Sequence, residues 1–482
     1  MKRTVAVIAL YALALSVSAQ TDDKTLSDYG KFRQELLAGY EGFRRGILED
    51  YDKFLDDVWK EYEHFLGEKR DPRPKPQTQP QKQPSEKPTA PVTQTPDVPK
   101  PAATPQQPAV TPTPTQPLTP AVEYQTFSFY GANVQVPKID YSPLSILRID
   151  QFGEGWRWLK SMKIEQQALP ALQQTAFACN LNDWFIYELI QSYADAVLPA
   201  GTPASRLSLT HYLMTHQGYD ARLGRTVEIP FLLLPMCQMV YARTYLVIGG
   251  QKYHIFTDRL AGQVLSGKQN YYSCNIPTDV DAGRKLNLII RPLNMPERNH
   301  PFSISYGGLT LQGNVNTTLI DMVRHYPQMP VPDYARSTLS PSLRRGMVSQ
   351  MKTQLASSQG MTAVNRLLRF VQKAFDYATD DDFHGYEKPY FFEETLYYPK
   401  CDCEDRSVFF AYLAKEVLNV DNCLLHYPGH ECTAIIRSDL SGDGFQLNNT
   451  NYYITDPTYI GADAGMCMPQ YRDVSPVVEF WY

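Results

Sequence analysis

Residues 71–120 limit the folding of this chain more than any other segment. Sixteen of these 50 residues are proline, and none is aromatic or glycine. Proline donates no backbone hydrogen bond, and so polar a segment buries too little apolar surface to order itself. The composition predicts a disordered linker of polyproline II character, with a reach on the order of 150 Å. We expect the segments on its two sides to move independently.

The first 19 residues have the pattern of a secretory signal peptide. Lys2 and Arg3 precede an apolar run from Val5 to Leu15, and Val17-Ser18-Ala19 supplies small residues for cleavage. This order of basic, apolar and small residues predicts export. No other apolar run is long enough for a membrane helix. The mature protein is therefore predicted to be soluble and either periplasmic or secreted.

An aromatic pattern recurs every 11 residues between the signal and the linker. Eleven residues make about three helical turns, so the aromatic side chains fall on nearly one face of a helix. Residues 20–70 are therefore predicted to form an amphipathic helix that pairs with a second copy, as in a coiled coil, or docks on the globular part or another surface. The aromatic pairs are Tyr29 and Phe32, Tyr40 and Phe43, Tyr51 and Phe54, and Tyr62 and Phe65.

Length, charge and cysteine content narrow the class of protein. A chain of 482 residues allows two or three domains. The net charge of −5 does not suggest a nucleic-acid partner. The cysteines are too scattered for a disulfide framework, so no pairing is predicted. They are Cys179, Cys237, Cys274, Cys401, Cys403, Cys423, Cys432 and Cys467.

Two globular regions follow the linker. Residues 121–330 are predicted to be a mixed α/β domain. In it, a helix runs from Leu181 to Val197, and Gly249-Gly250 between two apolar runs indicates a hairpin. Residues 331–482 carry the candidate site. The predicted fold class is α+β.

Cys403 occupies a position that suits a nucleophile. Asp402 is a good N-cap residue, and Asp405 lies three residues later, where a capping box has its partner. Cys403 is therefore predicted in the first turn of a helix, where free N–H groups and the helix dipole favour a negative sulfur. The apolar run from Val408 to Leu418 predicts that this helix is buried.

His430 and Asp456 stand at the ends of two predicted strands. His430 opens the run to Ile436, and Asp456 follows the run from Asn451 to Thr455. Turn residues between the runs predict a long hairpin, which places His430 and Asp456 close together. An aspartate there orients the imidazole and stabilises its charged form. Cys403, His430 and Asp456 are therefore the candidate catalytic residues.

These motifs resemble the transglutaminase-like superfamily, which is related to the papain-like cysteine proteases. The matching features are Asp402-Cys403 opening a helix, His430 opening a strand, and Asp456-Pro457-Thr458. Cys401 stands where the family has glycine, and Glu431 replaces the usual small residue. The resemblance covers roughly residues 340–482. It implies an exported bacterial protein with a papain-like core and no organic cofactor.

The resemblance implies thiol-dependent acyl transfer on a protein or peptide substrate. Cys403 would attack a peptide or carboxamide carbonyl, and the thioester would pass to water or to an amine. Because water is present at about 55 M, hydrolysis by a peptidase or amidase is the default, and transglutaminase-type transfer the variant. The competing hypothesis is a catalytically inactive binding or scaffold protein that uses the N-terminal helix for assembly.

Two nearby patterns are also compatible with metal ions, although no metal is predicted. Cys401 and Cys403 with His430 and Cys432 form a set of soft ligands, but structural zinc sites more often use two residues between the cysteines. The segment 439–444 is similar to half of a calcium loop, but Thr450 stands where the loop needs a bidentate glutamate.

The first globular region contains a possible internal copy of the second. The passage from the end of a helix into the next strand, from Leu213 through Gly218 to Arg222, is similar in sequence pattern to the passage from Leu413 to Cys423. At that register the nucleophile position falls near Thr202, which is not a thiol. We therefore raise the hypothesis of a degenerate copy that has lost its nucleophile.

Overall fold

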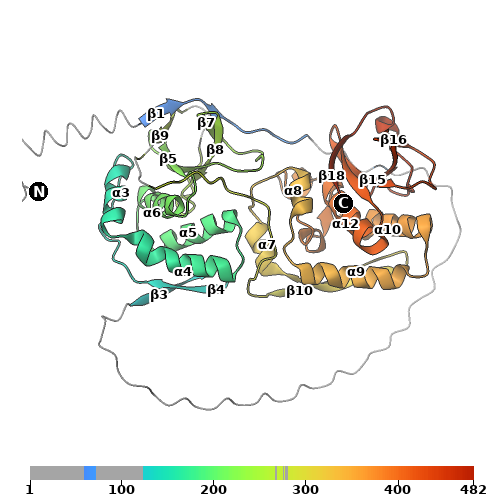
Figure 1. The fold of residues 1–482 in the computed structure, drawn as a ribbon, viewed down its shortest axis with the longest axis horizontal. Coiled ribbons are helices and arrows are strands. Elements are labelled where there is room, and N and C mark those ends of the chain that lie inside the picture. The colour runs from blue at the N-terminus through green and yellow to red at the C-terminus, as the bar shows by residue number, and fades with distance from the viewer. Residues whose placement is uncertain (1–58, 72–76, 78–122, 266–268, 275, 277–279) are drawn as a thin grey trace, which may run out of the picture. The chain divides into compact units, whose positions relative to one another are not determined.

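Two antiparallel sheets, each packed on one buried helix, organise the protein (Figure 1). The computed structural model describes residues 59–71, 77, 123–265, 269–274, 276 and 280–482. Of these, Tyr62–Tyr482 belong to one compact unit. Helices combined with antiparallel sheets agree with the predicted α+β class. The predicted signal peptide and nearly all of the predicted linker lie outside the described residues.

A hairpin and four helices precede the first sheet. β3 (Tyr124–Phe129) pairs with β4 (Ala132–Pro137), and the hairpin packs on α4 and α5. The helix predicted from Leu181 is confirmed as α5. The buried helix α6 begins after Thr202, whose hydroxyl accepts a hydrogen bond from the Ser205 N–H. The helices are α3 (Phe152–Ser161), α4 (Ile164–Ala178), α5 (Asp183–Val197) and α6 (Pro203–His216).

The first sheet is antiparallel and follows the order β9-β5-β6-β8-β7-β2 within the compact unit. Its strand β6 is buried along its whole length and packs on α6. Gly249-Gly250 joins β7 and β8, which confirms the predicted hairpin, and both glycines have positive φ, as tight hairpin turns require. The strands are β2 (His64–Phe65), β5 (Arg222–Arg225), β6 (Pro230–Leu234), β7 (Tyr245–Ile248), β8 (Gln251–Thr257) and β9 (Tyr271–Cys274).

A second hairpin opens the second half of the unit. β10 (Asn299–Tyr306) pairs with β11 (Leu309–Asn316), and the hairpin packs on α9 and α10. The helices of this half are α7 (Thr317–Val323), α8 (Val331–Arg336), α9 (Pro341–Leu355), α10 (Gly360–Ala374), α11 (Asp380–Phe383) and α12 (Cys403–Leu418). The short elements between α10 and α12 also include β12 (Asp376–Tyr377), a 3-10 turn (Glu394–Leu396) and β13 (Lys400–Cys401).

The second sheet is antiparallel and follows the order β16-β17-β15-β14-β18. α12 packs on β14 and β15, so the apolar run after Cys403 is buried as predicted. A 3-10 turn (Pro469–Tyr471) precedes the last strand. The strands are β14 (Asn422–Tyr427), β15 (His430–Ile436), β16 (Gly444–Leu447), β17 (Thr450–Thr455) and β18 (Val477–Trp481).

The two halves repeat one order of elements. In each half a hairpin packs on two helices, a buried helix follows, and five antiparallel strands complete the sheet. The strand orders β9-β5-β6-β8-β7 and β18-β14-β15-β17-β16 are identical when each half is taken in chain order. Arg206 and Arg406, each the fourth residue of its buried helix, both donate to backbone carbonyls where the preceding long helix ends. An internal copy would have this arrangement.

The described end of the predicted N-terminal helix is extended instead. The prediction is wrong for residues 59–70, which form β1 (Trp59–Tyr62), β2 and an extended segment. β2 pairs with the edge strand β7, and the ring of Phe65 stacks on Tyr245 at a centroid distance of 5.2 Å. An open sheet edge offers backbone hydrogen bonds and cross-strand packing, which override a weak helix propensity. The remainder of the predicted helix, residues 20–58, lies outside the described residues.

Candidate functional site

Cys403 is the first residue of α12, as predicted. The N–H of Asp402, the N-cap residue, donates to Asp405 Oδ2 at 3.3 Å, which is one of the two hydrogen bonds of a capping box. The other Asp405 oxygen accepts from the Tyr390 N–H at 2.7 Å. The start of α12 is therefore fixed both within the helix and to the loop that precedes it.

His430 and Asp456 are neighbours in the second sheet, as the predicted hairpin requires. β15 and β17 pair antiparallel, and His430 Nε2 lies 2.8 Å from Asp456 Oδ2. The other Asp456 oxygen accepts from the N–H groups of Thr458 and Tyr459 at 2.8 and 3.1 Å. The Asp-Pro-Thr turn thus holds the Asp456 side chain so that its other oxygen is aimed at the imidazole.

The second ring nitrogen of His430 faces no partner in the described part of the chain. His430 is 1 % exposed, and Nδ1 is buried without a hydrogen bond. The ring of Tyr471 stacks on the imidazole with an interplanar angle of 8° and a centroid distance of 5.2 Å. Asp456 and Tyr471 together fix the orientation of the ring and leave Nδ1 available for a proton. Sequence reasoning missed Tyr471, for which no motif gave a signal.

The packing of α12 on β15 brings the cysteine and histidine ends of the site together. Ser407, one turn after Cys403, donates its hydroxyl to the carbonyl of Glu431 at 3.1 Å. On the opposite side, the Gln372 amide of α10 donates to the carbonyls of Asp456 and Ala462, both at 3.0 Å. These bonds tie the loop after Asp456 to the helices and make the site rigid.

The Cys403 thiol lies in a buried and acidic environment. Cys403 is 0 % exposed, and its Sγ–H donates to Glu404 Oε2 at 3.2 Å. Asp380, Asp402 and Asp405 are also buried and bring carboxyl oxygens within 4.8 Å of one another. Nearby negative charge disfavours a thiolate. The helix position thus favours the thiolate while the neighbouring carboxyl groups oppose it.

Burial raises the pKa of these carboxyl groups. It is the main reason why the pKa of Asp380 is about 10, and the charges of Asp405 and Glu404 add to the effect. The pKa values of Asp402 and Asp405 are also raised well above the usual range, first by burial and then by Glu404. With a pKa of about 10, Asp380 is neutral at neutral pH and contributes one negative charge fewer to the surroundings of Cys403. The sequence places Asp402, Glu404 and Asp405 side by side, but it gave no sign that Asp380 joins them.

Two described residues from the start of the predicted linker, Asp71 and Gln77, contact the second half of the unit near the candidate site. Asp71 Oδ2 lies 3.8 Å from Nε2 of His426, whose Nδ1 is 2.7 Å from Glu431 Oε1. The Gln77 carbonyl accepts from the Ile460 N–H at 2.9 Å. Both contacts lie within a few residues of the His430–Asp456 pair. Sequence analysis predicted no contact between this segment and the candidate site.

The positions of the cysteines bear on the zinc ligand set suggested by the sequence and on disulfide pairing. All eight cysteines are free thiols, and all but Cys237 are buried. In the described chain His430, Cys432 and Asp456 bring possible ligand atoms within 4.8 Å of one another, but the set that includes His430 contains neither Cys401 nor Cys403. The ligand set suggested by the sequence is therefore not assembled as a group.

No family model, curated protein or solved structure matches this chain. Among the described residues, no helix is both long and apolar enough to cross a membrane.

Proposed function

We propose that the protein is an exported, transglutaminase-like enzyme that performs thiol-dependent acyl transfer on peptide or carboxamide bonds, with hydrolysis as its main reaction. One observation carries the proposal. The Asp456 carboxylate holds Nε2 of a buried, stacked imidazole, while Nδ1 stays without a partner in the described chain beside the helix that begins at Cys403. A histidine so held is oriented to exchange a proton with a neighbouring nucleophile.

The mechanism follows from the two ring nitrogens. Nε2–H donates to Asp456, so Nδ1 is the free base that accepts the Cys403 thiol proton. The thiolate attacks the carbonyl carbon, and the imidazolium returns its proton to the departing amine or ammonia, which leaves a thioester. Water then attacks the thioester, His430 takes the water proton, and the same proton goes back to sulfur as the acid is released.

A substrate carbonyl needs access to Cys403, which is fully covered in this structure. Covering side chains must move for the reaction to begin. The Glu404 carboxylate must also release the thiol proton toward His430. The proposal therefore includes a resting form in which the nucleophile is neutral and closed to solvent.

A second candidate function is a catalytically inactive binding or scaffold protein. It is favoured by the burial of Cys403 and by its hydrogen bond to Glu404, both of which suit an inert thiol. In this alternative the papain-like half holds a peptide, and the segment before the linker serves assembly. Export, with a periplasmic or secreted location, and self-association through residues 20–58 are part of both proposals and rest on the sequence.

Trapping of the acyl intermediate tests the enzyme proposal. The protein is incubated with a mixture of peptides that contain glutamine, in the presence of hydroxylamine, which converts a thioester to a hydroxamate. Mass spectrometry should find hydroxamates and hydrolysed peptides with wild type and neither with Cys403→Ala. Cys423→Ala, in the core of the same half, is the matched control and should behave as wild type. Equal products from wild type and Cys403→Ala would refute the proposal.

A further inference from the structure

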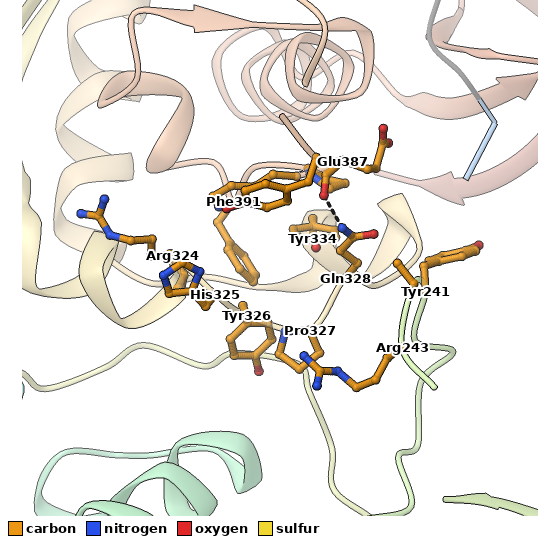
Figure 2. A pocket seen from close by; sticks show the side chains of 15 residues that line it. Tyr241, Arg243, Arg324, His325, Tyr326, Pro327, Gln328, Tyr334, Glu387 and Phe391 are labelled. Atoms are coloured by element: carbon orange, nitrogen blue, oxygen red, sulfur yellow. Dashed lines mark hydrogen bonds between the residues drawn. The ribbon is translucent and has the colours of Figure 1, made fainter. Parts of the chain in front are cut away.

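A cavity of about 200 Å³, which none of the three triad residues lines, lies where three segments of the compact unit meet (Figure 2). One segment is the connection around Tyr241–Arg243 in the first half. The second is the connection 323–328 between α7 and α8, and the third is the loop 386–391 ahead of α12. The lining combines aromatic rings with cationic side chains, and neither the candidate triad nor its mechanism uses it.

Arg243 has no acidic partner in the described part of the chain. Among the described residues no carboxylate oxygen lies within 4.0 Å of the Arg243 guanidinium, which donates a 3.4 Å hydrogen bond to the Ile255 carbonyl. Its central carbon lies 4.5 Å from the ring centre of Phe256, and burial lowers its pKa. A partly buried cation without a counter-ion has lost some of its hydration without gaining a charge partner. Arg243 is therefore the group in this cavity that most needs an anion.

The other charged groups of the cavity are already engaged. Arg324 pairs with Asp321 at 2.7 Å, and Lys388 pairs with Glu394 at 2.6 Å. The cavity's acidic residue, Glu387, has its carboxylate within 4.8 Å of Asp380 and Glu404. In Figure 2 its carboxylate points away from Arg243. The cavity therefore presents positive charge to a ligand.

His325 supports this description of the local field. Burial lowers the pKa of its imidazole, and the positive charges of Arg324 and Lys388 lower it further. A neutral histidine beside these two cations can donate one N–H to an anion without adding charge. His325 and Arg243 both line the cavity, as Figure 2 shows.

The remaining wall is built from aromatic rings. The rings of Tyr334 and Tyr326 contact Phe391 at centroid distances of 4.8 and 5.4 Å. The Tyr326 hydroxyl donates to the Leu288 carbonyl at 2.6 Å, which fixes the ring and uses its polar end. Such a wall offers a face on which an aromatic or other flat ring can stack.

We propose that this cavity binds a small organic carboxylate, with the carboxylate paired to Arg243 and a flat ring against the aromatic wall. The volume corresponds to about seven water molecules at the ~30 Å³ that each occupies in the liquid, which suits a molecule of one ring. A planar guanidinium binds a carboxylate through two parallel hydrogen bonds, which gives both charge and geometry. The proposal is independent of the triad and holds whether or not Cys403 is catalytic.

Calorimetry with three small probes tests the proposal on the full chain. Benzoate carries the charge and the ring, benzamide keeps the ring without the charge, and acetate keeps the charge without the ring. Benzoate should bind in the millimolar range or better, and the other two should bind at least about tenfold more weakly. Equal binding of benzoate and benzamide, or no binding of benzoate at millimolar concentration, would overturn the proposal.

Variants locate the site. Arg243→Gln should weaken the binding of benzoate by about tenfold or more, because a charge-assisted pair of hydrogen bonds is lost. Arg345→Gln, which removes an exposed arginine of α9, is the matched control and should leave the affinity unchanged. If circular dichroism shows that Arg243→Gln does not fold, the titration with benzoate is carried out on Arg243→Lys instead. It keeps the charge but not the paired donors, so benzoate should bind more weakly. Wild-type affinity in a folded Arg243 variant would place benzoate elsewhere and refute the assignment.

Discussion

His430 and Asp456 stand 26 residues apart in the chain and share a 2.8 Å contact between Nε2 and Oδ2 inside the second sheet. Because each side chain is at most 2 % exposed, water does not compete for this bond. The contact fixes which ring nitrogen carries the proton and which remains free. The proposed chemistry and the effect expected of Asp456→Ala depend on it.

Asp456→Ala should destabilise the protein and slow alkylation of Cys403. Loss of the carboxylate leaves a buried imidazole N–H without its acceptor, which costs about 1–3 kcal/mol of unfolding free energy. Urea denaturation measures this cost, and iodoacetamide labelling with peptide mapping measures the thiol. Asp439→Ala, at an exposed position in the same hairpin, is the control and should change both by little. If Cys403 is labelled as fast as in wild type, Asp456 has no influence on the reactivity of the thiol.

Glu404→Gln should make Cys403 more reactive. The Glu404 carboxylate accepts the thiol hydrogen bond at 3.2 Å and repels a negative sulfur. Removing the charge should lower the thiol pKa and speed alkylation near pH 6 by about tenfold, a change of one pKa unit. Glu416→Gln, on the exposed side of the same helix, should leave the rate unchanged. A slower rate in Glu404→Gln would show that this carboxylate acts as a base instead.

Asp380→Asn should stabilise the protein increasingly as the pH rises. The folded pKa of Asp380, about 10, lies far above the usual pKa of an aspartate, mainly because of burial. Because the pKa is raised in the folded state, the contribution of Asp380 to the free energy of unfolding is fully present below about pH 4. This contribution is lost as the pH rises toward 10. Asparagine never ionises, so the variant should lose this slope, which is at most about 1.4 kcal/mol per pH unit for one proton. Urea denaturation between about pH 5 and 9 checks it.

Asp381→Asn is the control for that pH series, because the neighbouring side chain is exposed. It should follow the wild-type curve. Parallel curves for wild type and Asp380→Asn over the whole range would mean that Asp380 does not ionise differently in the folded and unfolded states.

Arg206→Met should strongly destabilise the first half. Arg206 makes a bidentate ion pair with Asp258 at 2.9 and 2.6 Å, and both side chains are at most 7 % exposed. Removing one member of a buried pair leaves the other uncompensated and costs about 3–5 kcal/mol. Arg148→Met breaks the exposed pair with Asp150 and should cost less than about 1 kcal/mol. Similar losses in the two variants, measured by urea denaturation, would contradict the account.

The Arg206–Asp258 pair also shows how the two halves diverge. Asp258 follows β8 directly, as Asp456 follows β17, and Arg206 has the helix position of Arg406. Pro203 begins α6 where Cys403 begins α12. The first half therefore keeps an aspartate at the end of the strand but pairs it with an arginine, and it carries proline in place of the thiol.

Local sequence signals predicted much of the second half. The cap at Asp402, the strand that begins at His430 and the turn after Asp456 each depend on neighbouring residues, so pattern and spacing were sufficient. The Gly249-Gly250 hairpin was predictable for the same reason. Residues 59–70 were not, because their strand exists only where the edge of β7 is available.

Long-range packing decided what the sequence did not reveal at the site. Asp380 and Tyr471 reach the triad region from other segments, and no pattern in their local sequence predicts these contacts. The full burial of Cys403 is likewise a result of how α12 packs on the second sheet. The arrangement of acidic groups around the thiol emerges only in three dimensions.

The most direct test of the proposed triad is iodoacetamide alkylation of the intact protein near pH 6, where ordinary thiols with a pKa near 8.5 react slowly. Wild type is compared with His430→Ala and with the neighbouring His426→Ala, and peptide mapping locates each adduct. The account predicts that Cys403 reacts faster than the other buried cysteines and that only His430→Ala slows it, by about tenfold or more. Slow labelling of Cys403 at one rate in all three proteins would contradict the account.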